Sequence, residues 1–199
     1  MTTKSTTNTK DILHLKQIAE VISGVFLKPS PTGDIIYLQA KDIMMTSPEM
    51  TASRIDYTPK LDNYMLKEGD LLFAGKGSTY LCEVFDFDVS AVPSTTLYII
   101  RLRSDNVSSQ YLRWYLNHPK VVAKILASRV GSGTPMIHKP TLENLEIIIP
   151  DKNTQQRIVE LSELQKKEKS LLKSIAEKRV LVTNQILMNE INKYGYKKD

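Results

Sequence analysis

The chain has 199 residues, of which 41% are hydrophobic and 25% charged, as in an ordinary folded protein. Its single cysteine, Cys82, excludes an intramolecular disulfide and a cysteine-rich zinc cluster. No run approaches the roughly 18–20 apolar residues that span a bilayer, and the first residues lack an apolar signal core, so we expect a cytoplasmic protein with no membrane partner. The net charge of +5 is compatible with an anionic partner but does not require one.

The first part of the chain favours a mostly β domain. Residues 1–12 are a polar run that we expect to be disordered, and structure is expected from residue 13. Short apolar runs rich in β-forming residues then alternate with turn-forming segments up to about residue 107. The clearest predicted strands are Ile35–Leu38, Leu71–Ala74, Tyr80–Phe85 and Leu97–Ile100.

Two short helices and a closing strand follow. The apolar period changes between Ser108 and Asn117, which predicts a helix, and a second helix is predicted from Lys120 to about Arg129. Residues 130–135 have the composition of a loop, and a strand over Leu145–Ile149 ends at Pro150. The aromatic residues of the first helix are expected to belong mainly to the core. We therefore expect one domain over residues 13–150.

The last part of the chain predicts one long helix. No Gly or Pro occurs between about Thr154 and Lys193, and apolar residues recur there at steps of three and four. This spacing is typical of a coiled-coil seam, although Glu168 and Arg179 interrupt it. Because the sequence supplies no second long helix to cover the apolar stripe, a partner chain or a second copy is implied. The seam consists of Ile158, Leu161, Leu164, Leu171, Leu172, Ile175, Val182 and Ile186.

The usual signatures of catalysis are missing from the sequence. It contains no nucleophile elbow, phosphate-binding P-loop, zinc-protease pair or dinucleotide-binding glycine turn. Pro150-Asp151 resembles the start of a nuclease metal site, but no (D/E)-x-K triplet follows it. The three histidines are not at metal-binding spacing. We expect no enzyme activity, metal or cofactor, and we interpret residues 75–78 as a hairpin loop in preference to a phosphate site.

One internal stretch has no acidic residue between Asp105 and Glu143. Its basic residues could neutralise DNA phosphates, with the glycine-rich loop bringing backbone N–H groups close to the duplex. Two amphipathic helices with basic outer faces would explain the same pattern equally well. The candidates for backbone contacts are Arg113, Lys120, Lys124, Arg129, Ser132, Thr134, His138 and Lys139.

The order of these features resembles the specificity subunits of type I restriction-modification systems. Gly131-Ser-Gly-Thr-Pro135, the strand ending at Pro150 and the start Thr154-Gln-Gln-Arg-Ile158 are similar to the junction between a target recognition domain and its spacer helix. Gln155 replaces the usual Glu there. Leu15–Gly24, Glu68–Gly75 and Tyr111–Leu116 also resemble segments of this family, so that the resemblance covers about residues 13–193.

The resemblance implies an α+β chain with a target recognition domain at 13–150 and a spacer helix at 151–199 for dimerisation and subunit docking. Full-length members carry two recognition domains and two antiparallel spacer helices, whereas this chain has one of each. It should therefore form a homodimer through an antiparallel coiled coil and recognise a bipartite duplex DNA site. Methyltransferase and restriction subunits would be its further partners. Candidate base-contacting residues, chosen by chemistry alone, are Lys41, Arg54, Lys60, Lys76, Ser78 and Tyr80.

Two other hypotheses remain open at this point. A coiled-coil adaptor would have a similar helix and a globular head that binds protein instead of DNA. It would lack the steep salt dependence that phosphate neutralisation gives to DNA binding. A phosphodiesterase without a recognisable signature is the third hypothesis, and it would cleave DNA in the presence of magnesium.

Overall fold

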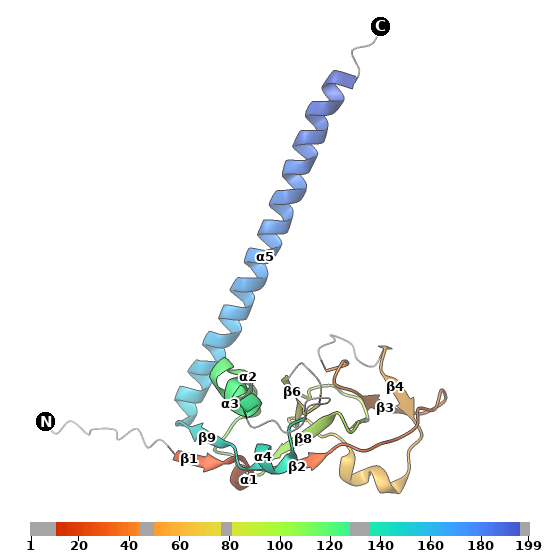
Figure 1. Ribbon diagram of the computed structural model, residues 1–199, viewed down its shortest axis with the longest axis vertical. Coiled ribbons are helices and arrows are strands. Elements are labelled where there is room, and N and C mark those ends of the chain that lie inside the picture. Colours follow the sequence, from red (N-terminus) through yellow and green to blue (C-terminus); the bar gives the residue numbers. More distant parts are fainter. Residues whose placement is uncertain (1–10, 44–49, 77–80, 128–135, 196–199) are drawn as a thin grey trace, which may run out of the picture. The chain divides into compact units, whose positions relative to one another are not determined.

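The computed structural model describes residues 11–43, 50–76, 81–127 and 136–195, and it divides into a unit of residues 1–156 and a unit of residues 157–199 (Figure 1). The first unit is rich in strands, whereas the second is the greater part of one long helix. In chain order the elements are β1 (Asp11–His14), α1 (Leu15–Ile18), β2 (Ala19–Ser23), β3 (Ile35–Leu38), β4 (Ser53–Ile55), the 3-10 helix η2 (Pro59–Tyr64), β5 (Leu71–Ala74), β6 (Cys82–Val84), β7 (Ala91–Pro93), β8 (Leu97–Leu102), α2 (Ser109–Asn117), α3 (Pro119–Ala127), α4 (Lys139–Glu143), β9 (Glu146–Ile149) and α5 (Lys152–Gly195).

In the part of the first unit that the structure describes, three small sheets form the framework. The largest is antiparallel in the order β2-β8-β5-β6, with Leu72 of β5 opposite Ile99 of β8. A second sheet has the order β4-β3-β7, in which β3 pairs antiparallel with β4 and parallel with β7. The antiparallel pairing of β5 with β6 confirms the hairpin expected around residues 75–78, although residues 77 and 78 lie outside the described residues.

Buried apolar side chains of these strands form the hydrophobic core. Leu72, Ile99 and neighbouring residues form one buried cluster, and Tyr37, Ile55 and Val92 belong to another beneath the second sheet. The predicted helix at 108–117 is confirmed as α2, where Leu112 and Leu116 are buried. Burying one such side chain contributes roughly 1.5–3 kcal/mol, so these clusters hold the short strands together.

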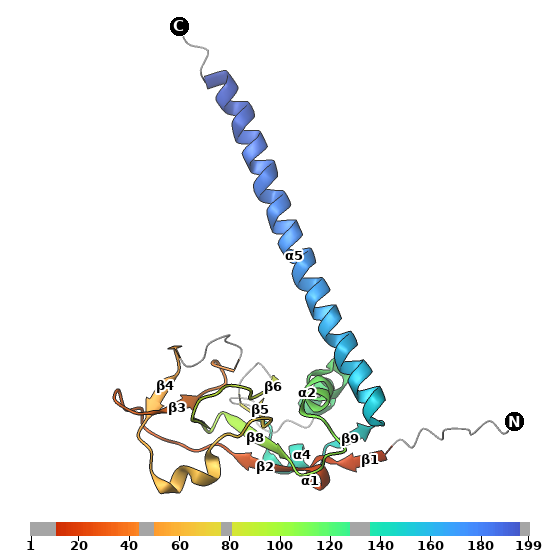
Figure 2. The same cartoon turned by 180° about the vertical axis from the view of Figure 1, so that it is seen from behind.

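The third sheet joins the two ends of the first unit. β1 pairs antiparallel with β9, with Asp11 opposite Ile149 and Ile12 opposite Ile148 (Figure 2). Asp11 and Ile12 therefore belong to a strand, and the expectation of a disordered tail over 1–12 is wrong for these two residues. They are polar or exposed, but the backbone of β9 supplies hydrogen-bond partners that the local sequence does not reveal. Residues 1–10 lie outside the described residues.

Hydrogen bonds between Asp151 and Thr154 fix the start of helix α5. Pro150 ends β9, and the Asp151 carboxylate accepts hydrogen bonds from the Thr154 amide and hydroxyl at 3.0 and 2.7 Å. These bonds lower the pKa of Asp151, because they stabilise its charged form. Asp151 is thus the N-cap of the helix.

Gln155, in the first turn of α5, is 2% exposed and makes three side-chain hydrogen bonds. Its Oε1 accepts from the Ser108 amide at 3.0 Å. Its Nε2 donates to the carbonyl oxygens of Asn106 and Pro150 at 2.7 and 2.8 Å. Ser108 is also the N-cap of α2, so one amide joins the start of α5, the end of β9 and the start of α2.

The predicted α+β organisation is confirmed, with a strand-rich first unit and a long C-terminal helix that the sequence predicts almost to its ends. The second predicted helix, expected from Lys120, begins one residue earlier as α3, because Pro119 fits the first helical position, where a proline needs no amide donor. No helix in the described residues has the length and apolar character that crossing a membrane requires.

Substituting Gln155 tests the importance of this junction. We expect Gln155→Ala to lower the free energy of unfolding by about 2–3 kcal/mol, because it removes a buried side chain and leaves one backbone amide and two carbonyl groups without their partner. Urea unfolding followed by Trp114 fluorescence measures the change. The exposed Lys152→Ala in the same turn is the control and should change stability by less than about 0.5 kcal/mol. Equal losses in both variants would contradict this account of Gln155.

Candidate nucleic-acid interface

Several basic residues of the acid-free stretch lie beside carboxylates from elsewhere in the chain. Arg113 of α2 is 3.1 Å from a carboxylate oxygen of Glu83 on β6, and Lys124 of α3 is 2.8 Å from one of Glu146 on β9. The hydrogen bond between Lys124 and Glu146 raises the pKa of Lys124 and lowers that of Glu146. The stretch contains no acidic residue itself, but the fold places carboxylates from other segments next to it. The charges of Arg113 and Lys124 are therefore already partly neutralised.

Lys139, at the first position of α4, is 3.6 Å from Glu143 one turn later. Lys120 of α3 is exposed and forms no ion pair with a carboxylate in the described part of the chain. His138 precedes α4 as its N-cap residue and is also exposed. Of this group, Lys120 retains the most accessible charge. Arg129, Ser132 and Thr134 lie outside the described residues.

The end of β5 approaches the segment that leads into α4. Lys76 forms an antiparallel bridge with Met136, and the Ile137 amide donates to the carbonyl oxygen of Gly75 at 2.9 Å. A β-carbon at Gly75 would lie 2.3 Å from the Tyr98 ring, so only glycine fits there. Lys76, half-buried, is thus brought close to the chain just before His138 and Lys139. Ser78 and Tyr80 of the same hairpin loop lie outside the described residues.

The other candidate base-contacting residues lie on or next to the second sheet. Lys41 occupies the turn after β3, Arg54 is the middle residue of β4, and Lys60 is in η2; all three are exposed. None of them forms an ion pair with a carboxylate among the described residues. Arg54 lies opposite Ile36 on β3, which fixes the position of its backbone. These long donors are therefore available to a ligand.

Exposed apolar side chains near the same sheet were not selected from the sequence. Phe26 is 76% exposed, whereas its neighbours Val25 and Leu27 pack against the core of the second sheet. Tyr57, two residues after β4, is 47% exposed, and its hydroxyl donates to Asp62. The sequence alone does not single out Phe26. Its outward direction follows only when the segment is known to be extended, with Val25 and Leu27 facing the core.

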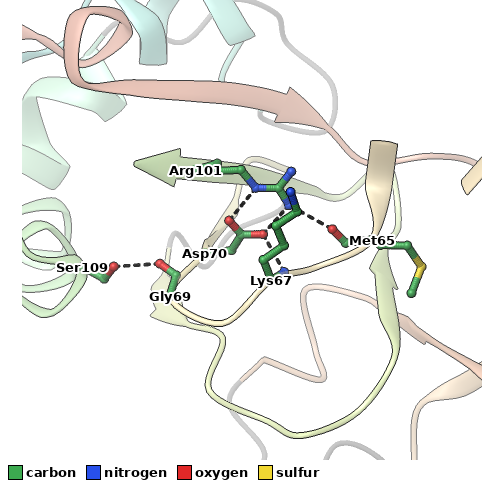
Figure 3. Close-up of polar contacts among 6 residues, drawn as sticks. All are labelled: Met65, Lys67, Gly69, Asp70, Arg101 and Ser109. Carbon is green, nitrogen blue, oxygen red and sulfur yellow. Dashed lines mark hydrogen bonds and ion pairs between the residues drawn. The ribbon is translucent and has the colours of Figure 1, made fainter. Parts of the chain in front are cut away.

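An ion pair between the partly buried Arg101 and the buried Asp70 fixes the turn that precedes β5 (Figure 3). The Arg101 guanidinium donates to both carboxylate oxygens of Asp70 at 2.8 and 2.6 Å and to the carbonyl oxygen of Met65 at 2.9 Å. Asp70 is 2% exposed and also accepts from the Lys67 amide. The pKa of Arg101 is raised, mainly because its guanidinium donates hydrogen bonds to the Asp70 carboxylate. Arg101 is therefore structural and carries no free charge for a phosphate.

The same turn is fastened to α2. Gly69 has a φ of 83°, a conformation that favours glycine, and its carbonyl oxygen accepts from the Ser109 hydroxyl at 2.7 Å (Figure 3). Ser109 is the first residue of α2, and the turn is thereby held at both ends.

A hollow of about 520 Å³ lies next to this turn, but its charge is wrong for DNA. Glu68, Asp86 and Asp88 contribute carboxylates, and Phe85 and Phe87 contribute apolar surface. A site lined by three carboxylates repels phosphate. This hollow is therefore not a candidate for DNA contact.

The predicted dimer seam lies along helix α5, within the second unit. Ile158 is partly buried. The other seam residues are between 47% and 69% exposed, namely Leu161, Leu164, Leu171, Leu172, Ile175, Val182 and Ile186. Such a row of exposed apolar side chains on one helix is typical of an interface with another chain.

Known proteins similar to this chain share its fold. A family described as the type I restriction modification DNA specificity domain matches residues 8–178. The type I restriction-modification system S subunit from M. genitalium is similar in structure, with a TM-score of 0.57 and 14% identity over 83% of this chain and 41% of that one. The HsdS subunit from Thermoanaerobacter tengcongensis gives a TM-score of 0.65 and 18% identity over 86% of this chain and 41% of that one.

A third solved structure, described as the structural basis of complex assembly and conformational transition of the type I R-M system, gives a TM-score of 0.66. It is 19% identical over 88% of this chain and 43% of that chain. This chain thus spans about two fifths of the length of these solved chains. No curated protein sequence matches it. The family is defined by DNA specificity and not by catalysis, in agreement with the expectation that the chain is not an enzyme. Since the family match covers most of its length, the chain belongs to the type I restriction modification DNA specificity domain family.

Proposed function

We propose that this chain is the DNA-recognition component of a type I-like restriction-modification system, and that it works as a homodimer on a bipartite site. The observation that carries the proposal is the match to a DNA specificity domain over residues 8–178. Methyltransferase and restriction subunits would bind the chain and carry the chemistry, together with the methyl donor and ATP. The proposal places the chain in the cytoplasm, where those partners and the DNA would be.

The proposed DNA contacts divide into two groups. Lys41, Arg54, Lys60 and Lys76 would contact base edges in the major groove, because they are long donors on turns and strand positions. Ser78 and Tyr80, next to Lys76 in sequence, belong to this group by the same chemistry.

The second group would contact the phosphate backbone and includes Arg113, Lys124, Lys139, Arg129, Ser132, Thr134 and His138. Lys120 is its leading member, because its charge is not shared with a described carboxylate. Arg113, Lys124 and Lys139 would share their positive charge between a phosphate and the carboxylates already beside them.

Self-association is supported by the exposed seam of α5. One chain contributes one recognition unit and one spacer helix, and an isolated amphipathic helix of this length leaves its apolar side chains in water. A second copy would cover them and supply a second recognition unit. Two-fold symmetry would then give inverted half-sites separated by a fixed gap.

Binding to mixed-sequence duplex DNA tests the recognition role. Affinity measured by fluorescence anisotropy should fall by at least about tenfold between 50 and 200 mM salt, because bound cations are released from the DNA. Lys120→Ala should weaken binding and reduce the slope of log affinity against log salt by about 1. Arg103→Ala, which removes a cation paired with Glu20 outside the proposed interface, should leave the slope unchanged. Absence of binding at low salt would favour the adaptor hypothesis instead.

The solution mass of the purified chain tests self-association. We expect about twice the 22.6 kDa of one chain. Leu171→Lys with Ile175→Lys should give a monomer, because two charges would have to be buried in the seam. Ser170→Lys with Ser174→Lys adds the same charges beside the seam and should leave the dimer intact. A monomeric wild-type chain would contradict self-association and leave DNA recognition possible.

A further inference from the structure

The long helix α5 (Figure 1) carries two series of residues at seven-residue spacing. One is Leu161, Glu168, Ile175 and Val182, and the other is Ile158, Gln165, Leu172, Arg179 and Ile186. Together they alternate at steps of three and four, which is the period of 3.5 that keeps a seam facing its partner helix. They therefore define the core positions of a coiled coil, and Leu164 and Leu171 of the predicted seam lie directly beside these positions.

Two charged residues interrupt this otherwise largely apolar seam. Glu168 and Arg179 are both exposed, and in the described part of α5 neither forms an ion pair. The ion pairs of this helix lie elsewhere, between Glu163 and Lys166, Lys173 and Glu177, and Glu190 and Lys193. A charge buried in a coiled-coil seam without a partner is strongly destabilising. Whatever covers this seam must therefore supply opposite charges at both positions.

A second copy of the chain supplies them if it runs antiparallel. In such a pair each residue faces the one equally distant on the other side of the two-fold axis, and one seven-residue series meets the other. With the axis midway between Lys173 and Ser174, Glu168 of each copy faces Arg179 of its partner. The same register places Leu161 opposite Ile186, Leu172 opposite Ile175, and Gln165 opposite Val182.

Other arrangements place these charges badly. Moving the register by one heptad brings Glu168 opposite either Leu172 or Ile186, so that its carboxylate faces hydrocarbon. A parallel pair in register brings Glu168 opposite its own copy and Arg179 opposite its own copy, and like charges then repel. Of these arrangements, only the antiparallel register with its axis between Lys173 and Ser174 gives both Glu168 and Arg179 a partner of opposite charge.

We propose that reciprocal Glu168–Arg179 ion pairs between two copies of α5 select the antiparallel direction and the register of their pairing. This inference rests on the self-association in the proposed function and specifies its geometry. The two pairs lie symmetrically within the seam, where their value is specificity more than stability. They also fix the separation of the two recognition units, since a slip along the seam would change it.

Charge reversals on the full-length chain test the pairing. Glu168→Arg alone and Arg179→Glu alone should each weaken self-association about 100-fold or more, because like charges then meet at two places in the dimer. The double variant should restore it, and an equimolar mixture of the two single variants should form mixed dimers. Sedimentation equilibrium measures the masses. Glu177→Arg, a reversal on the outer face of the helix, is the control and should leave the dimer unchanged.

Orientation is tested in two independent ways. Wild-type chain mixed with the double variant should form no mixed dimers if the helices are antiparallel, whereas a parallel pair would mix readily. Nitroxide labels on Ser162→Cys should lie about 35 Å apart along an antiparallel pair, but within about 20 Å in a parallel one. Cys82 is buried and should not react with the label.

The outcomes separate the proposed Glu168–Arg179 pairing from self-association in general. A wild-type dimer that tolerates both single reversals, or labels close together, would overturn the proposed pairing and leave self-association standing. A monomeric wild-type chain would overturn both. Circular dichroism and Trp114 fluorescence check that every variant is folded, and DNA anisotropy on the same samples reports separately on recognition. Restoration by the double variant would support the pairing even if a single variant proved unstable.

Discussion

The side chain of Gln155 is the contact on which the first unit and the start of the helix both depend. It replaces water at three backbone groups at once, which come from the loop before α2 and from the end of β9. A buried amide with all its partners is stabilising, whereas the same groups without it would be costly. A glutamate at this position could accept hydrogen bonds but, when ionised, could not donate to the carbonyl oxygens of Asn106 and Pro150. Glutamine is therefore matched to the three partners that this chain presents.

Several basic residues of the first unit form ion pairs with carboxylates of the same unit, and this changes which residues are candidates for DNA contact. Arg101 is held by Asp70, Arg113 by Glu83 and Lys124 by Glu146, although the members of each pair are far apart in sequence. The same logic, applied to α5, gives a different result. Glu168 and Arg179 lack such neighbours in the described helix, and a symmetric copy would provide them. Local pairing stabilises the globular unit, and pairing between copies would specify an assembly.

The sequence predicted the features that depend on local periodicity. The long helix, α2, and strands such as β3 and β5 follow from apolar spacing and from turn formers at their ends. Strands β1, β4 and β7 were not predicted, because each is three or four residues long and is stabilised by partners distant in the chain, as Asp11 is by Ile149. The candidate site was affected by the same limit. Glu83 and Glu146 cannot be assigned to Arg113 and Lys124 from sequence, and the outward direction of Phe26 depends on how Val25 and Leu27 pack.

The central claim is that two copies of one chain recognise two copies of one short sequence. Selection of bound duplexes from a random-sequence pool by the purified chain, followed by sequencing, tests this most directly. The account predicts enrichment of identical half-sites in inverted orientation with a constant gap between them. Enrichment of a single half-site without its inverted copy, or of no sequence at all, would contradict it.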